Sequence, residues 1–129
     1  MRNFPWLWKD FSLLSAFFSI CITSLKAEEF IAKRGTYEKN GQKIEIKNLS
    51  GLPSFYADFY SAENVVKIKC SAGNLVLKKG NYFYAYRGTH KGLVITATAH
   101  VENNIIKSII YEEWDKANDI KTIISYYKK

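Results

Sequence analysis

The chain has 129 residues, of which 47% are hydrophobic and 16% aromatic, and its formal net charge is +7. This composition excludes an intrinsically disordered chain, and the length suits one globular domain rather than two. A positive charge of this size could favour nucleic acid or an anionic surface. Most lysines, however, alternate with apolar residues, as on the solvent face of a half-buried strand, so we expect no nucleic-acid partner.

The first 27 residues have the features of a signal peptide. Arg2 and Lys9 precede an apolar run, residues 11–25, that is shorter than the roughly 20 residues needed to cross a bilayer. Cleavage after Ala27 would release residues 28–129 as a single domain with 16 basic and 11 acidic residues. The segment therefore predicts export, either to the periplasm or into the medium.

Two alternatives to this cleavage stay open from the sequence. Leu25 is larger than the small residue normally found near a cleavage site, so the segment could remain as an uncleaved membrane anchor. Cys21 suggests a lipoprotein, although Ile20 is larger than the residue that normally precedes a lipid-bearing cysteine. Apart from this segment, no contact with a membrane is expected.

Removal of the segment leaves Cys70 as the single cysteine of the exported domain. No intramolecular disulfide is then possible, so stability must come from the burial of apolar side chains. Alternation places Cys70 on the same strand face as Val66 and Ile68, which favours a buried thiol. A reactive thiol and an intermolecular disulfide are the alternatives.

The first half of the domain predicts a hairpin followed by separate short strands. Asn40-Gly41 separates two alternating runs, residues 34–39 and 42–47, and both turn residues tolerate the positive φ of a type I′ turn. Turn-forming residues occupy 48–53. Further strands with alternating apolar and polar residues are predicted at 54–61, 64–70 and 75–78.

The second half continues the pattern of short strands. They are predicted at 81–87, 93–101 and 105–111, with a loop at 88–92. Short strands at a spacing of about 8 to 12 residues indicate a mainly β fold, a small antiparallel β-barrel or a sandwich of about eight strands.

The C-terminal segment, residues 114–127, fits two structures. Apolar residues from Trp114 to Tyr127 fall at helical spacing, which favours a short helix. Residues 120–127 are also rich enough in β-branched and aromatic residues for a strand.

The exported domain lacks the residue patterns of common metal and catalytic sites. A zinc site needs several ligands at paired spacings, and only His90, His100 and Cys70 are present. We expect His90 in a loop and His100 in a strand. No nucleophile elbow, metalloprotease motif, phosphate-binding loop or dinucleotide fingerprint occurs.

Acidic residues could still act as a pair in glycoside hydrolysis. Only Glu112 and Glu113 are adjacent, and neighbours in a strand face opposite ways; Asp58 and Asp115 are the other candidates. Cys70 on an apolar strand face would be a poor nucleophile. We therefore predict a non-enzymatic protein with no cofactor and no metal.

Short motifs spread over most of the exported domain carry a family resemblance. They lie at 35–41 (Gly-Thr-Tyr-Glu-Lys-Asn-Gly), 44–47, 55–59, 75–86 and 125–129. In these motifs the chain resembles the small exported β-domains of bacteria that are lysozyme-inhibitor-like. In such domains a Gly-x-Tyr strand opens the chain and a similar strand closes it, which would make residues 120–127 a strand.

The resemblance implies a function as well as a fold. It implies an inhibitor or immunity-type protein whose partner is another exported protein, such as a lysozyme-like enzyme. A loop or edge of the rigid domain would enter the cleft of that enzyme and block the substrate. This chain lacks the cysteine pair of those domains and their closing glycine, so no inhibitory residue is carried over.

Two other functions fit the same sequence. A barrel could hold a small apolar molecule in a cavity lined by Phe55, Phe59, Phe83 and isoleucines. Alternatively, the domain could be a structural component of the cell envelope. For a protein-binding function, we expect the contacts to come from the loops at 48–54 and 88–92.

Overall fold

The computed structural model describes residues 27–70 and 73–129. These residues form nine strands and no helix, so none of them belongs to a helix long and apolar enough to cross a membrane. The strands are β1 (Glu28–Lys39), β2 (Gln42–Glu45), β3 (Phe55–Tyr60), β4 (Val65–Cys70), β5 (Gly73–Lys79), β6 (Tyr84–His90), β7 (Leu93–Glu102), β8 (Ile105–Asp115) and β9 (Ile120–Lys128). The predicted signal peptide, with Cys21, lies outside the described residues except for Ala27.

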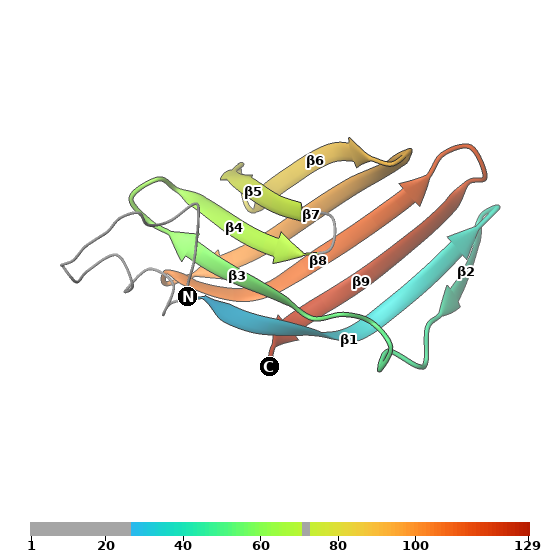
Figure 1. Ribbon diagram of the computed structural model, residues 1–129, viewed down its shortest axis with the longest axis horizontal. Coiled ribbons are helices and arrows are strands. Elements are labelled where there is room, and N and C mark those ends of the chain that lie inside the picture. The colour runs from blue at the N-terminus through green and yellow to red at the C-terminus, as the bar shows by residue number, and fades with distance from the viewer. Residues whose placement is uncertain (1–26, 71–72) are drawn as a thin grey trace.

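Eight of the strands form a closed antiparallel barrel, and β2 is an extra strand beside β1 (Figure 1). Neighbours around the barrel follow the chain from β3 to β9, and β1 closes the ring by pairing with both β9 and β3. β1 has room for a third partner because residues 28–30 pair with β3 and residues 36–39 pair with β2. The prediction of a small barrel of about eight strands is confirmed.

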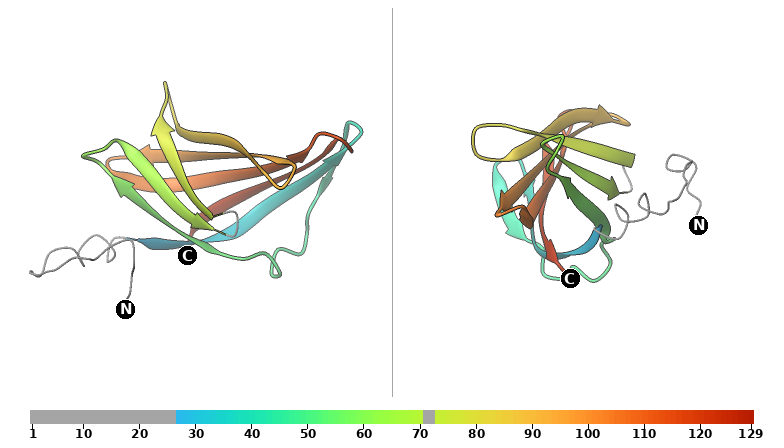
Figure 2. Two further views of the ribbon diagram at one scale, coloured as in Figure 1. Left: turned by 45° about the horizontal axis from the view of Figure 1, so that its top comes forward. Right: turned by 90° about the vertical axis from the view of Figure 1, so that its left-hand side faces the viewer.

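The strands differ in length, so the wall is not equally deep all round (Figure 2). β1, β8 and β9 have 12, 11 and 9 residues, whereas β3 and β4 have 6 each. The long strands therefore continue past the end of β3 and β4, and β2 lies beside this extension of β1. We call residues 46–54, which lead back from β2 to β3, the strap.

Residues with positive φ form tight turns between neighbouring antiparallel strands. Asn40 and Gly41 have φ of 51° and 82°, as the Asn-Gly motif predicts for a type I′ turn. Lys91 and Gly92 have φ of 52° and 82° and make the turn from β6 to β7. The predicted loop at 88–92 is therefore wrong, because residues 88–90 belong to β6 and pair with β7.

The core is built by alternation along each strand, with small residues between large ones. Ala97 and Ala99 of β7 are fully buried. Ala99 lies between Tyr84 of β6 and Ile109 of β8, and Ala97 lies opposite residues 86 and 111 in the same strands. Alanine on β7 leaves room inside the barrel for the larger side chains on either side.

Two further predictions are settled by strand pairing. Residues 120–128 form β9, so the prediction of a C-terminal strand is confirmed and the alternative of a helix is wrong. The reason is that backbone hydrogen bonding to both β8 and β1 outweighs the helical spacing of the apolar residues. The predicted strand at 81–87 begins later, at Tyr84. Tyr82, which precedes the strand, is 85% exposed, whereas Tyr84 is buried and Tyr86 packs against the core.

Candidate functional site

A pocket of about 170 Å³ lies within the barrel, where β3 begins and β4 ends. Its walls come from the strap, β3, β4, β8 and β9. The lining residues are Leu52, Pro53, Ser54, Phe55, Cys70, Tyr111, Glu113, Thr122, Ile124 and Tyr126. Aromatic and aliphatic side chains thus converge with a few polar groups, which is the usual composition of a small-ligand site.

The polar part of the pocket comes from β8. Tyr111 and Glu113 follow Ile109 at every second position, so all three face the interior. The Tyr111 hydroxyl donates a hydrogen bond of 3.0 Å to Glu113 Oε2. Burial and the negative charge of Glu113 raise the pKa of Tyr111 above its ordinary value, so this phenol keeps its proton and remains a donor.

Tyr126 joins the wall of the pocket to the strap. Its ring lies 4.2 Å from the ring of Phe55, centroid to centroid, and its hydroxyl donates to the Pro53 carbonyl oxygen at 3.4 Å. Burial raises the pKa of Tyr126, with a further contribution from Cys70. The strap is therefore held against β9 directly beside the pocket.

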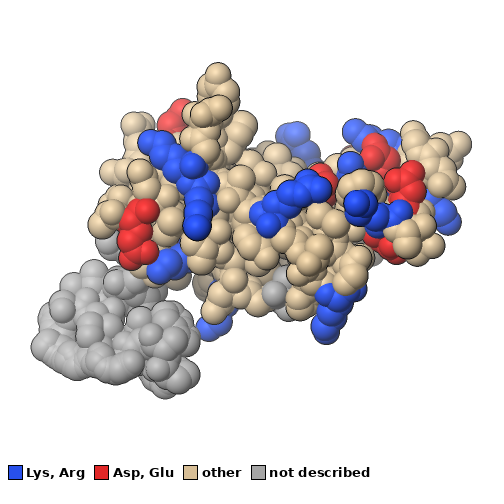
Figure 3. Space-filling view, turned by 90° about the horizontal axis from the view of Figure 1, so that it is seen from above, with Lys and Arg blue, Asp and Glu red and all other residues tan. Residues whose placement is uncertain are grey.

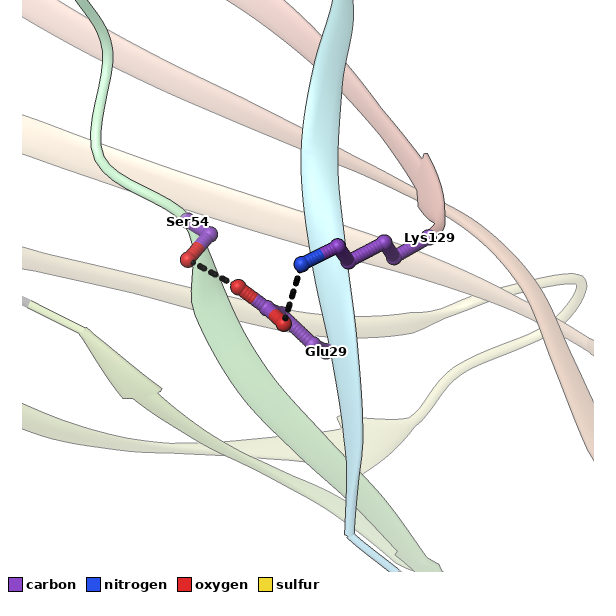
Figure 4. Close-up of polar contacts among 3 residues, drawn as sticks. All are labelled: Glu29, Ser54 and Lys129. Carbon is purple, nitrogen blue, oxygen red and sulfur yellow. Dashed lines mark hydrogen bonds and ion pairs between the residues drawn. The ribbon is translucent and has the colours of Figure 1, made fainter.

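A second group of contacts holds the end of the strap on β1 (Figure 4). The Ser54 hydroxyl donates to Glu29 Oε2 at 2.7 Å, and Lys129 Nζ lies 3.3 Å from Glu29 Oε1. The hydrogen bonds from Ser54 and Lys129 lower the pKa of Glu29. Within the strap, Asn48 Oδ1 accepts hydrogen bonds from the backbone and the side chain of Ser50.

Cys70 lies in the wall of this pocket at the end of β4. It packs against the core on the same face as Val66 and Ile68, so the predicted strand face is confirmed. Its side chain is only half-buried, so the prediction of a fully buried thiol is not confirmed. Its thiol donates to the Gly73 carbonyl oxygen at 3.5 Å. No disulfide occurs among the described residues.

The two histidines lie apart from the pocket. His90 ends strand β6 instead of lying in a loop, which corrects the prediction, because the turn is only two residues long. His100 is on β7 as predicted and is exposed, with its ring 6.1 Å from that of Phe83. Residues 27–70 and 73–129 contain no cluster of three metal-ligating side chains.

The structure places the acidic candidates in different surroundings. Glu112 and Glu113 face opposite sides of β8, and Glu113 alone lines the pocket. Asp115 accepts hydrogen bonds from Asn118 in the turn to β9. Asp58 is 8% exposed on β3, where it accepts a hydrogen bond from Tyr60 and helps, with burial, to raise the pKa of that phenol to about 12.

The predicted apolar cavity is divided between two places. Phe55 lines the interior pocket, whereas Phe59 and Phe83 line a separate hollow of about 340 Å³ at the other end of the barrel. That hollow lies between the turns from β3 to β4, β5 to β6 and β7 to β8. Among the pockets lined by described residues, none brings all three phenylalanines together, so the prediction of a single cavity is wrong for this part of the chain.

Sequence reasoning missed Tyr111, Glu113 and Thr122 as pocket residues. A signal was present, since Ile109, Tyr111 and Glu113 alternate along one strand. Continuation of the predicted strand at 105–111 by two residues would have placed a carboxylate on its apolar face. The strap residues gave no comparable signal, because turn-forming residues do not reveal what they cover.

Charge on the outer surface is mixed. On the face seen in Figure 3, lysines and arginines are spread over the molecule and interspersed with acidic residues. The ion pairs Lys67–Glu63 and Lys128–Glu28, at 3.6 and 2.8 Å, are examples at the surface. The interior pocket differs from this surface in having one acidic side chain and no basic one among its lining residues.

Comparison of the chain with protein-family models, with curated proteins and with solved structures found no significant match.

Proposed function

We propose that this chain is an exported, non-enzymatic binding protein that holds a small ligand in the interior pocket of its barrel. The observation that carries the proposal is the pocket itself, whose lining combines the Tyr111–Glu113 pair with the aromatic rings of Phe55 and Tyr126. Eight-stranded barrels can enclose one small ligand, and a site of this kind needs a few fixed polar groups within apolar walls.

The hydrogen bonds around the pocket support a preformed site. Tyr111 is bonded to Glu113, Tyr126 to the strap, and Ser54 to Glu29. A site whose walls are already fixed loses little side-chain freedom when a ligand binds.

A fragment screen tests this proposal. Residues 28–129, which contain every strand of the barrel, are labelled with ¹⁵N and titrated with small molecules of positive, negative and zero charge. We expect at least one compound to shift the amide signals of residues 111–113 and 122–126 in a saturable way. If no compound shifts these signals, the ligand-binding proposal is wrong.

A pair of variants locates the binding. Thr122→Phe would fill the pocket, whereas Ile123→Phe adds the same ring on the opposite face of β9. We expect Thr122→Phe to abolish the response to the compound and Ile123→Phe to leave it unchanged. Thermal unfolding of both variants shows whether the barrel is retained.

Inhibition of a lysozyme-like enzyme is the second proposed function, and the strap favours it. Residues 48–51 are mostly exposed, and Asn48 fixes their conformation through its bonds to Ser50. The two-residue turn at Lys91-Gly92 offers less surface than the predicted loop at 88–92, so the strap is the better candidate for entering a cleft. Stoichiometric loss of activity in a panel of lysozymes would support inhibition, and undiminished activity throughout would exclude it for those enzymes.

A further inference from the structure

Among the described residues, no cation lies beside the Glu113 carboxylate in the pocket. Among the described residues that line the pocket, none is Lys, Arg or His. None of the ion pairs within residues 27–70 and 73–129 includes Glu113. Its described hydrogen bond comes from the neutral Tyr111 hydroxyl at 3.0 Å.

A half-buried carboxylate without a counter-ion favours a ligand that supplies the positive charge. Removing a carboxylate from water is costly unless the group is paired, and an N⁺–H···O⁻ bond is among the stronger pairings. The protein as a whole is basic, with a formal net charge of +7. An acidic residue facing inward therefore gives the pocket a charge opposite to the net charge of the protein.

The other walls of the pocket suit an organic cation rather than a metal ion. Phe55, Tyr111 and Tyr126 bring three aromatic rings to the lining, and aromatic faces attract ammonium groups. Leu52 and Ile124 add aliphatic surface for an apolar body. A single carboxylate supplies few of the six to eight oxygen ligands that calcium takes.

The size of the pocket limits the ligand. A volume of about 170 Å³ corresponds to roughly five or six water molecules at the volume that each takes up in the liquid. A long-chain fatty acid would exceed this volume, and its anionic head would be repelled by Glu113.

We propose that the interior pocket binds a small amine, with its ammonium group at Glu113 and its apolar body between the aromatic rings. This inference rests on the ligand-binding function proposed above. It replaces the purely apolar ligand suggested by the sequence with a cationic one that has an apolar part.

Three probes of nearly equal size test the charge preference in the unaltered protein. They are 2-phenylethylamine, 2-phenylethanol and phenylacetate, which carry a cationic, a neutral and an anionic head on the same ring. Isothermal titration calorimetry with residues 28–129 at neutral pH should show the amine binding about tenfold tighter than the alcohol, as expected for a charge-assisted hydrogen bond. Phenylacetate should bind more weakly than the alcohol.

A matched pair of variants assigns the preference to one side chain. Glu113→Gln keeps the shape and removes the charge, so it should lower the affinity for the amine about tenfold and leave the affinity for the alcohol unchanged. Glu112→Gln makes the same change on the opposite face of β8 and should have no effect on either. Because the three probes are compared in the unaltered protein, the test holds even if one variant fails to fold.

The outcomes separate the two proposals. Equal binding of the amine and the alcohol, or an unchanged preference in Glu113→Gln, overturns the cationic ligand while ligand binding stands. If no probe binds and no fragment shifts the pocket signals, ligand binding itself is overturned.

Discussion

The Ser54 hydroxyl donates a hydrogen bond of 2.7 Å to Glu29, where the strap meets the first residues of β1. The backbone pairing between β1 and β3 is short at this point, since it involves residues 28–30 alone. Lys129 contacts the same carboxylate and donates its backbone N–H to the Glu29 carbonyl oxygen at 2.9 Å. Glu29 thus links three separate parts of the chain at the place where the barrel closes.

Removal of the Glu29 charge should reduce stability in a pH-dependent manner. The pKa of Glu29 is lowered in the folded state by Ser54 and Lys129, so the ionised form is favoured by folding. Its contribution is present above the unfolded value of about 4.5 and is lost as the pH falls through the lower folded value. The melting temperature of Glu29→Gln should therefore lie below that of the wild type at pH 7, with a smaller difference at pH 3. A difference that stays constant between these pH values would contradict this linkage.

Adjacent isoleucines on β8 should respond differently to truncation. Ile109 is fully buried, whereas Ile110 is 44% exposed on the outer face. Ile109→Ala should destabilise the barrel by about 2–5 kcal/mol because it leaves a cavity, and Ile110→Ala by about 0.5 kcal/mol or less. Urea denaturation of both variants measures the free energy of unfolding. Similar losses in the two variants would mean that the faces of β8 are assigned incorrectly.

Gly35 should be coupled to Ile124 across the β1–β9 pair. A Cβ atom at Gly35 would lie 2.8 Å from Ile124 Cδ1 and 3.2 Å from a methyl group of Leu49 in the strap. Gly35→Ala should therefore destabilise the fold by about 1–3 kcal/mol through overpacking. Ile124→Val removes the Cδ1 atom, so the double variant should be more stable than the sum of the two single changes predicts.

The control for this cycle lies in the strap. A Cβ atom at Gly51 would meet no atom within 4 Å, so Gly51→Ala should change the free energy of unfolding by about 0.5 kcal/mol or less. Additive losses for Gly35→Ala and Ile124→Val would show that the two residues do not meet.

Tyr60 should release its proton later than an ordinary tyrosine. Burial and the neighbouring Asp58 raise its pKa to about 12 from the model-compound value of 10.0. The associated stability is complete below pH 10 and is lost as the pH rises from about 10 to 12, because the unfolded chain loses this proton first. Burial also raises the pKa of Tyr111 and Tyr126, so absorbance at 295 nm should show several late-titrating phenols, and Tyr60→Phe should remove one of them. An unchanged late phase in Tyr60→Phe would assign that phase to another tyrosine.

Local patterns predicted most strands because the physics that forms them is local. Asn40 and Gly41 accept positive φ more readily than other residues do, so these two residues were enough to predict the position of this hairpin. The alternation of Val66, Ile68 and Cys70 placed one face of β4 correctly. The barrel class followed from the number and spacing of such strands.

Features that depend on distant neighbours were harder to predict. Gly88 suggested a loop, yet it lies within β6, where its lack of a Cβ leaves room for the Tyr86 hydroxyl. The C-terminal residues are a strand because β8 and β1 flank them, and no local pattern contains that information. The pocket depends on the strap packing beside Tyr126, a contact between residues 73 positions apart.

Closure of the ring by β1 and β9 also has a consequence for how the chain folds. Phe30 pairs with Lys128, so the two strands that seal the barrel lie at opposite ends of the described sequence. Contacts of such long range form slowly, because a large loop must close before they can stabilise anything. Until β9 is in place, β1 and β8 present unpaired edges that can bond to another molecule of the same protein. Conditions that delay the last strand should therefore favour aggregation over a monomeric barrel.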